Sequence, residues 1–342
     1  MQNCSPLAWK AWGWPASARQ RHIEGLRAIA VIAVVGYHVG LPGFAGGFVG
    51  VDVFFVISGY VICGHITSLK DRGELDIFNF WLRRIARLAP AGIFVVAVVG
   101  AVGLATLPQD RALQLAAAIL PAAGFTANLH FIAVASDYHS AMAALNPLLH
   151  MWSLGVEAQF YVIWPLAALL MAPRFRVAGV VLIGLTSLAV SAAVTPTHPT
   201  LAYYGLPSRL WEMAAGAALV LSGRRAPAWA AAVGIAAIIL AVMWFDAATP
   251  FPGYAAVLPV LGALLAIAAP SPMLGGAGLV WIGARSYSWY LWHWPLIVFS
   301  EMIQSGLYVR LAASGIALAF AAITWALIEE PARKWGRRWA AI

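Results

Sequence analysis

The sequence predicts an all-α protein, a polytopic transmembrane helical bundle of about ten spans. Hydrophobic residues make up 62% of the 342-residue chain, and charged residues make up only 10%. The mean hydropathy is +0.82. Because a soluble domain carries about 25% charged residues, this chain could not cover a surface that faces water. The same composition excludes a disordered chain, and two cysteines are too few for a disulfide-stapled secreted scaffold.

Ten windows of mainly apolar residues approach the roughly 20 residues that a helix needs to cross the hydrocarbon layer. They lie near 25–43, 46–66, 91–107, 151–171, 177–194, 207–222, 228–245, 254–270, 282–301 and 310–328. An eleventh apolar stretch, 112–134, is interrupted by Pro121, Asn128 and His130.

The basic residues indicate whether this eleventh stretch crosses, because cytoplasmic loops carry an excess of lysine and arginine. With ten spans and a cytoplasmic N-terminus, 16 basic residues lie inside, and Arg111, Arg209 and Arg310 lie outside. An eleventh crossing would invert every later segment and give 10 inside and 9 outside, so the excess of basic residues inside would be lost. We therefore expect both termini in the cytoplasm and an extracytoplasmic segment, 108–148, that is re-entrant or lies along the interface. Re-entrant backbone needs surrounding protein or a water-filled cavity, so this segment also predicts a cavity.

The domain organisation is simple: an interfacial cytoplasmic tail (1–22), one membrane domain (23–331) and a basic cytoplasmic tail (332–342). The net charge of +8 could indicate nucleic acid binding. The basic residues instead form short clusters between apolar stretches, which is typical of loops that face an anionic leaflet. We expect the lipid bilayer as a partner, and no nucleic acid. The sequence also shows no internal repeat of the kind found in inverted-repeat transporters.

The first span carries two ionisable side chains, each of which costs about 2.5 to 3.5 kcal/mol at the bilayer centre. Arg27 and His38 are eleven positions apart. Eleven helical steps leave an offset of about 20°, so both project from one face, about 16.5 Å apart along the axis. The alternative is that neither residue has a functional role. The Arg27 side chain would then extend to the inner membrane interface, and His38 would be a core histidine whose hydrogen bonds are satisfied. After this span, Gly46, Gly47 and Gly50 predict a tight turn and a close approach of the first two spans.

The second and fourth spans add acidic groups. Asp52 lies near the outer end of the second span, at a depth similar to that of His38, where a carboxylate could hold an imidazole. Its alternative is a packing residue paired with an arginine. In the fourth span, spacings of seven and four place His150, Glu157 and Tyr161 on one helical stripe. Glu157 is the second candidate to hold the imidazole, and the alternative for Tyr161 is an aromatic belt.

Arginines gather in the inner loop that follows the second span. Arg83, Arg84 and Arg87 belong to a predicted interfacial helix that ends at Pro90, and Pro331 is expected to end the last helix in the same way. Arginines so placed can clamp phosphate groups in a bidentate way, and anchoring to anionic lipid explains them about equally well. The sequence contains no phosphate-binding glycine loop, no GxSxG motif and no Cys/His metal spacing, so we expect no metal site.

Six stretches of the chain occur together and in order in one known family. They are RHIEGLRAIAVIAVVGYH, GGFVGVDVFFVISGYVI, RRIARLAP, HMWSLGVEAQFYVIWP, SYSWYLWHWPL and IEEP, and they run from about residue 22 to residue 331. The chain therefore resembles the acyltransferase-3 family, bacterial integral-membrane enzymes that move acyl groups, most often acetyl from acetyl-CoA, to sugars of cell-surface glycans.

The resemblance implies roles for matching residues. The catalytic positions fall on His38, Asp52, Glu157 and Arg27, and the basic loop falls on Arg83, Arg84 and Arg87. Members often have an arginine where Ala86 stands and an acid where Ala158 stands, so this chain departs from the family there. Many relatives also carry a C-terminal SGNH hydrolase-like domain that these residues lack. A separate extracytoplasmic transfer partner would then complete the reaction.

The expected reaction joins these observations. Acyl-CoA, the donor substrate, binds from the cytoplasm with its phosphates on the loop arginines and Arg27, and no cofactor is bound permanently. His38 acts as general base or as nucleophile, and a glycan or glycolipid acceptor meets it from outside. His150, Trp152 and Tyr161 are expected on the acceptor side. We therefore expect the protein in the bacterial inner membrane.

The rival interpretation is a proton-coupled transporter or exporter, since proton relays also use buried histidine and carboxylates. A third interpretation is a non-catalytic assembly protein.

Overall fold

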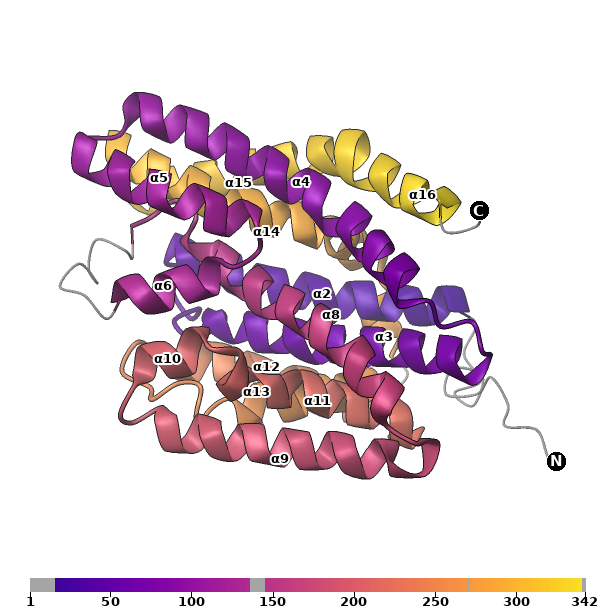
Figure 1. The fold of residues 1–342 in the computed structure, drawn as a ribbon. Coiled ribbons are helices and arrows are strands. Elements are labelled where there is room, and N and C mark those ends of the chain that lie inside the picture. Colours follow the sequence, from indigo (N-terminus) through magenta and orange to yellow (C-terminus); the bar gives the residue numbers. More distant parts are fainter. Residues whose placement is uncertain (1–15, 136–144, 270, 340–342) are drawn as a thin grey trace. The chain divides into compact units, whose positions relative to one another are not determined.

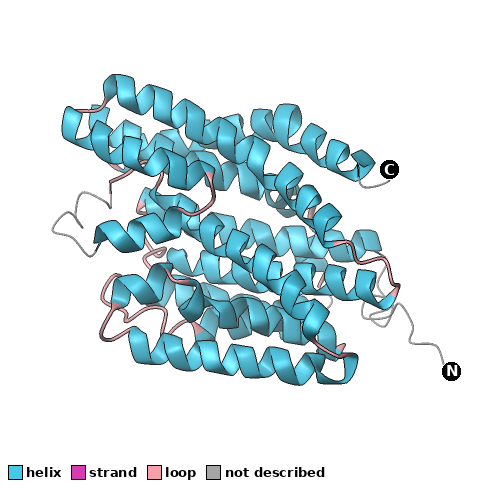
Figure 2. Ribbon diagram, viewed as in Figure 1, coloured by secondary structure: helices cyan, strands magenta, loops and turns pink. Residues whose placement is uncertain are grey.

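The computed structural model describes residues 16–135, 145–269 and 271–339. Every regular element in these ranges is helical (Figures 1 and 2). This confirms the all-α fold that the composition predicts. Six of the described helical stretches are long and apolar enough to cross a membrane: Gln20–Val39, Gly47–Asp71, Ile77–Thr106, Leu149–Leu170, Pro173–Val194 and Leu307–Trp335. The chain is therefore a multi-pass membrane protein.

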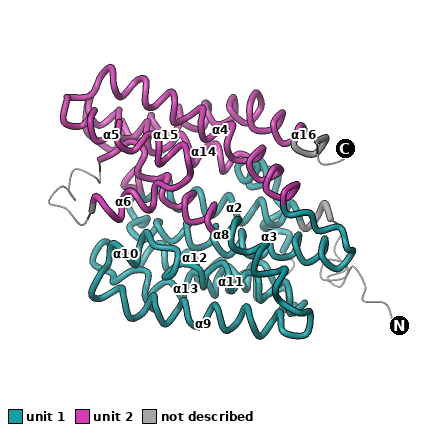
Figure 3. The backbone as a smooth tube through the Cα atoms, viewed as in Figure 1, with its two compact units in different colours: residues 1–37, 42–77, 160–284 teal, residues 38–41, 78–159, 285–342 magenta. Residues whose placement is uncertain are grey.

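The chain divides into two compact units, each built from three separate stretches of sequence (Figure 3). Of the five boundaries between the units, one lies in the loop after residue 39, one lies at the start of the helix Ile77–Thr106, and three lie inside helices. These helices are α2 (Ala16–Val39), α8 (Trp152–Leu170) and α14 (Ala277–Ile303). Unit 1 consists of residues 1–37, 42–77 and 160–284, and unit 2 of residues 38–41, 78–159 and 285–342.

Unit 1 contains most of the helices from the middle of the sequence. They are η1 (Gly47–Val49), α3 (Gly50–Asp71), η3 (Pro173–Phe175), α9 (Arg176–Val194), α10 (Pro199–Tyr204), α11 (Leu206–Ser222), α12 (Trp229–Trp244), α13 (Val257–Ala268) and η4 (Pro272–Gly275). Helix α11 packs against α3 and α9, and α12 packs against α13.

Small residues set the spacing of these helices. A methyl group added at Gly59 on α3 would collide with the backbone carbonyl of Met213 on α11, and one at Gly216 would collide with that of Val56. The two backbones therefore touch, as they do in membrane helix pairs that use small residues at the contact. The predicted close approach of the first two spans is also confirmed, because Gly47 lies against the Ala33 carbonyl in the same way.

Unit 2 contains the remaining helices. They are α4 (Ile77–Thr106), α5 (Gln109–Ala123), α6 (Ala127–Ala135), η2 (Leu149–Met151), α15 (Leu307–Thr324), the π-helix η5 (Trp325–Glu329) and α16 (Glu330–Trp339). The stretch 112–134 is not one continuous helix, because the chain turns between α5 and α6, where Phe125 has a φ of 55°. This break fits an interrupted segment better than a straight crossing.

Two predicted helix ends are wrong. Helix α4 passes through Pro90 and runs on to Thr106. The missing N–H of Pro90 costs one bond to the Ala86 carbonyl, and membrane helices tolerate this loss where neighbouring groups replace it. Pro331 likewise does not end the last helix, because it is the second residue of α16, which follows the π-helix η5 without a break and continues to Trp339.

Candidate functional site

His38 is the centre of the candidate site. It lies in the last turn of α2, in the stretch that belongs to unit 2, and its side chain is half-buried. Its Nδ1 atom is 3.0 Å from Nε2 of His293 on α14. The indole of Trp294 lies beside the His38 ring, with 4.7 Å between the ring centroids. The His38 imidazole is thus held between two consecutive aromatic residues of one helix.

Arg310 holds the end of α2 in place. Its Nε donates to the carbonyl of Val39 at 2.7 Å, and its Nη1 donates to Glu301 at 3.1 Å. The last carbonyls of a helix have no intrahelical partner, so this bond satisfies one of them directly after His38. The sequence predicted only an extracytoplasmic charge at Arg310; the structure gives it a contact next to the candidate site.

A proline explains the geometry of α14. Pro295 has no N–H, which leaves the carbonyl of Leu291, four residues earlier, without its helical donor. His150 fills this gap, because its Nε2 lies 3.1 Å from the Leu291 oxygen and must donate to it. His150 is buried and sits in the 3₁₀ turn η2. The prediction that it shares one helical stripe with Glu157 and Tyr161 is therefore wrong, and its hydrogen bond to the α14 backbone indicates a structural role.

Tyr290 and His293 add further bonds within unit 2. The hydroxyl of Tyr290 donates to the His150 carbonyl at 2.8 Å and lies 2.6 Å from Oγ of Ser153. Nδ1 of His293 lies 2.7 Å from the carbonyl of Tyr290. His293 is completely buried, and its ring meets that of His150 with a centroid distance of 5.7 Å. In the described part of the chain, no three histidine, cysteine or acidic residues are placed to hold a metal ion.

Asp52 belongs to a different cluster, within unit 1. Its Oδ1 accepts a bond of 2.9 Å from Nη1 of Arg209, and the same nitrogen donates to Glu212 at 3.1 Å. All three side chains are at most 1% exposed. The guanidinium also lies over the rings of Tyr203 and Phe251, 4.9 and 5.1 Å from their centroids. The geometry matches the alternative interpretation of Asp52, a packing residue paired with an arginine.

Arg209 is a partner of Asp52 that sequence reasoning missed. The sequence counted it among the outside charges and gave it no partner, and the structure shows it buried in α11. Arg209 and Glu212 are one helical turn apart, facing a carboxylate from α3, so the pair satisfies charges that would otherwise be very costly to bury. The signal that could have found them is an Arg and a Glu three residues apart at the start of an apolar window.

The other predicted residues of α8 are dispersed. Glu157 is half-buried in unit 2. Trp152 is buried at the start of the helix, in the same unit. Tyr161 is buried in unit 1, beside the ring of Phe160, which stacks on Trp164.

The loop arginines lie on α4 of unit 2. Arg83, Arg84 and Arg87 are all half-buried, and the guanidinium of Arg84 lies 5.3 Å from the centroid of Phe80. Helix α14 is tied to this part of α4, because the Tyr287 hydroxyl donates to the Leu88 carbonyl at 2.7 Å. Their role as phosphate ligands stays a prediction.

Arg27 lies in unit 1. It is half-buried, and its guanidinium lies 6.0 Å from the centroid of Phe54. Its role as a catalytic and phosphate-binding residue also stays a prediction.

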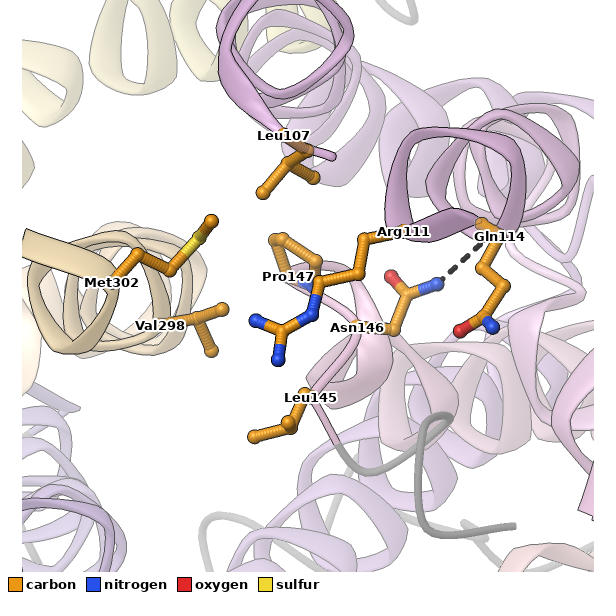
Figure 4. Close-up of a pocket in the computed structure, with 8 residues that line it drawn as sticks. All are labelled: Leu107, Arg111, Gln114, Leu145, Asn146, Pro147, Val298 and Met302. Carbon is orange, nitrogen blue, oxygen red and sulfur yellow. Dashed lines mark hydrogen bonds between the residues drawn. The ribbon is translucent and has the colours of Figure 1, made fainter. Parts of the chain in front are cut away.

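A pocket opens beside the histidines, entirely within unit 2 (Figure 4). It is lined by Leu107, Arg111, Gln114, Leu145, Asn146, Pro147, Val298 and Met302. Figure 4 shows the guanidinium of Arg111 directed into the space between Val298 and Leu145. The pocket is joined to the candidate site, because the Asn146 carbonyl accepts a 2.9 Å bond from the indole of Trp294, the residue that flanks His38.

A family model described as an acyltransferase domain matches residues 21–328. The chain belongs to the acyltransferase-3 family. It is 30% identical to the peptidoglycan O-acetyltransferase OatA of Listeria monocytogenes, over 92% of this chain and 56% of that protein. It is 31% identical to the putative peptidoglycan O-acetyltransferase YrhL of Bacillus subtilis and 32% identical to the O-acetyltransferase OatA of Staphylococcus aureus, over 92% of this chain and 55% and 57% of those proteins. The chain thus spans about half the length of these relatives. No solved structure matches it.

The residues that the sequence predicted for the site of this acyltransferase-3 chain fall into two groups, one in each unit. His38, His150, Trp152, Glu157 and the loop arginines belong to unit 2, whereas Arg27, Asp52 and Tyr161 belong to unit 1. Sequence reasoning gave no role to His293. The available signal was the WHWPL string, an intramembrane histidine two residues before a proline.

Proposed function

We propose that this acyltransferase-3 protein is a membrane-bound O-acyltransferase that moves an acetyl group from cytoplasmic acetyl-CoA to a hydroxyl of an extracytoplasmic glycan. The observation that carries the proposal is the half-buried imidazole of His38, which is bonded through Nδ1 to His293 and joined through Trp294 to the pocket at Arg111. The family and the names of the relatives support O-acetyl transfer. Those names also favour peptidoglycan-like glycans over lipopolysaccharide or exopolysaccharide as the acceptor.

His38 acts as general base in this proposal. A positioned histidine contributes roughly 10² to 10⁴ in rate by taking the proton of the attacking hydroxyl. Arg83, Arg84 and Arg87 bind the phosphates of the donor, since guanidinium and phosphate form bidentate pairs. The cytoplasmic position of α4 and the inner-membrane location belong to the same proposal.

The pocket at Arg111 receives the acceptor. Its enclosed space of ≈ 10 Å³ is that of about one water molecule, so the acceptor contacts the mouth of the pocket with one end group and is not enclosed by it. Apolar and polar side chains line it together, and Arg111 favours an end group that carries a carboxylate or phosphate. Five of its lining residues, Arg111, Gln114, Leu145, Asn146 and Pro147, belong to the segment 108–148 that the sequence predicts to be extracytoplasmic.

The test uses the purified full chain in liposomes with radiolabelled acetyl-CoA and soluble peptidoglycan fragments as acceptor. We expect label in the fragments, stoichiometric release of coenzyme A, and neither product with His38→Ala. His130→Ala is the matched control, because His130 lies on α6 of the same unit and has no role in the proposal. Full transfer by His38→Ala would overturn the proposal.

The same assay separates the rival mechanisms. Label that stays bound to the wild-type protein, and not to His38→Ala, would replace the general base by an acetyl-histidine intermediate. Import or export of the fragments without release of coenzyme A would favour the transporter.

A further inference from the structure

We propose that His293 is a positioning residue that fixes the tautomer of His38, so that Nε2 of His38 is the atom that takes the proton of the acceptor hydroxyl. The proposal rests on the proposed function of His38 and names the atom that reacts. It follows from two hydrogen bonds whose directions can be assigned, one from His293 to the backbone and one between the two rings.

The first bond sets the tautomer of His293. Its Nδ1 lies 2.7 Å from the carbonyl oxygen of Tyr290, and a carbonyl can only accept, so Nδ1 carries the hydrogen. His293 is completely buried, and an isolated charge there would be costly, so the resting ring is neutral. A neutral imidazole with hydrogen on Nδ1 has its lone pair on Nε2, which makes Nε2 of His293 an acceptor.

The second bond sets the tautomer of His38. Nε2 of His293 and Nδ1 of His38 are 3.0 Å apart, so His38 must donate through Nδ1. The neutral His38 ring then has its lone pair on Nε2. In serine hydrolases an aspartate orients the catalytic histidine by accepting from its Nδ1–H. Here the acceptor is a second imidazole, whose own orientation is set by the backbone of α14.

The local fold holds this arrangement in place. Two successive carbonyls of α14 each receive an N–H from a histidine, Tyr290 from His293 and Leu291 from His150. The second is available because Pro295 cannot donate to it. The WHWP sequence thus supplies both the imidazole that contacts His38 and the proline that helps to tie this part of the helix to η2.

The transfer step balances with these groups alone. The acceptor O–H bond breaks as its proton moves to Nε2 of His38, and the oxygen attacks the thioester carbonyl of acetyl-CoA. When the C–S bond breaks, the coenzyme A thiolate takes the same proton from Nε2. In between, His38 is a cation whose Nδ1–H donates to the lone pair of His293. Both histidines return to their starting tautomers.

The direct test measures the tautomer and needs no activity. Nitrogen-15 NMR of the ¹⁵N-histidine-labelled full chain in detergent distinguishes protonated from unprotonated ring nitrogens, and His38→Gln assigns the His38 signals. We expect hydrogen on Nδ1 and none on Nε2 of His38. Hydrogen on Nε2 of neutral His38 would overturn the proposal.

The second test compares two replacements of His293 in coenzyme A release. His293→Gln keeps an amide oxygen that can accept from His38, whereas His293→Phe keeps a ring and removes the acceptor. We expect His293→Phe to lower kcat by about 100-fold with an unchanged KM for acetyl-CoA, and His293→Gln to stay within about tenfold of wild type. His130→Phe is the matched control and should not change either constant.

The outcomes separate this proposal from the proposed function. Full activity of His293→Phe, together with an inactive His38→Ala, would overturn the role of His293 and leave that of His38 intact. Equal losses in His293→Gln and His293→Phe, with unchanged thermal unfolding, would also overturn it, because the acceptor would then make no difference. Full transfer by His38→Ala would instead overturn the proposed function, whatever the tautomer.

Discussion

Replacing Arg209 by methionine should strongly destabilise the protein. The guanidinium lies 2.9 Å from Asp52 and 3.1 Å from Glu212, and the three side chains are at most 1% exposed. At an effective dielectric constant of about 20, each contact corresponds to about 5 kcal/mol of gross attraction. Desolvation of the charges offsets much of this, and removing one partner of a buried pair costs about 3 to 5 kcal/mol, because the remaining charge stays buried without compensation.

This loss should appear as a lower unfolding temperature. At about 2 to 4 °C per kcal/mol for a unit of this size, Arg209→Met should unfold about 6 to 20 °C below wild type. Cys63, buried in α3 of the same unit, provides the assay, because a thiol-reactive dye labels it only on unfolding. A Cys4→Ser background leaves Cys63 as the single thiol.

A matched variant tests the reasoning. Arg72 forms an ion pair of 2.8 Å with Glu74, with both side chains about half exposed, so Arg72→Met should cost less than about 1 kcal/mol. Adding Asp52→Asn and Glu212→Gln to Arg209→Met should recover part of the loss, because it removes the uncompensated carboxylates. If Arg209→Met and Arg72→Met unfold within about 2 °C of each other, the argument from burial is refuted.

Three further predictions concern unit 2. Arg111→Ala should raise the KM for an anionic glycan acceptor about tenfold and leave that for acetyl-CoA unchanged in transfer kinetics; equal KM values in wild type and variant would contradict the acceptor pocket. His150→Phe should cost about 1 to 3 kcal/mol because the Leu291 carbonyl loses its donor, but less in a Pro295→Ala background, where an N–H is restored; additive losses in thermal unfolding would contradict this coupling. Arg84→Gln should raise the KM for acetyl-CoA about tenfold without changing the rate with acetyl-pantetheine, which has no phosphates; equal effects on both donors would argue against a phosphate contact.

The sequence predicted the helices better than their contacts. Apolar windows and helical spacing are local properties, so all ten windows correspond to helices, and His38 was correctly placed in the first of them. The partner of His38 could not be found in this way, because His293 is 255 positions away. Reasoning by charge favoured Asp52 or Glu157 as the partner, and it overlooked that a neutral imidazole can accept the same hydrogen bond.

Other errors arose where one sequence rule was applied without regard to the surrounding residues. Pro90 and Pro331 were expected to end helices, since proline lacks an N–H, but the position in the helix and the apolar residues that follow decide whether the helix continues. Arg209 was given no partner because it was considered only as a charge at the end of an apolar window. One of its two carboxylate partners, Asp52, comes from another helix, and a linear sequence does not show such a pair.

The interleaved division of the chain has a consequence for its biosynthesis. Unit 2 draws its first residues, 38–41, from the end of α2 and its last stretch from 285–342. His38 is therefore synthesised long before His293. The pair can form only when most of the chain has been translated. Since no single cut in the sequence separates the two units, truncated products would contain His38 without its partner. If His38 and His293 act as proposed, synthesis through His293 is a condition for catalysis, and chains that end before it should not release coenzyme A from acetyl-CoA.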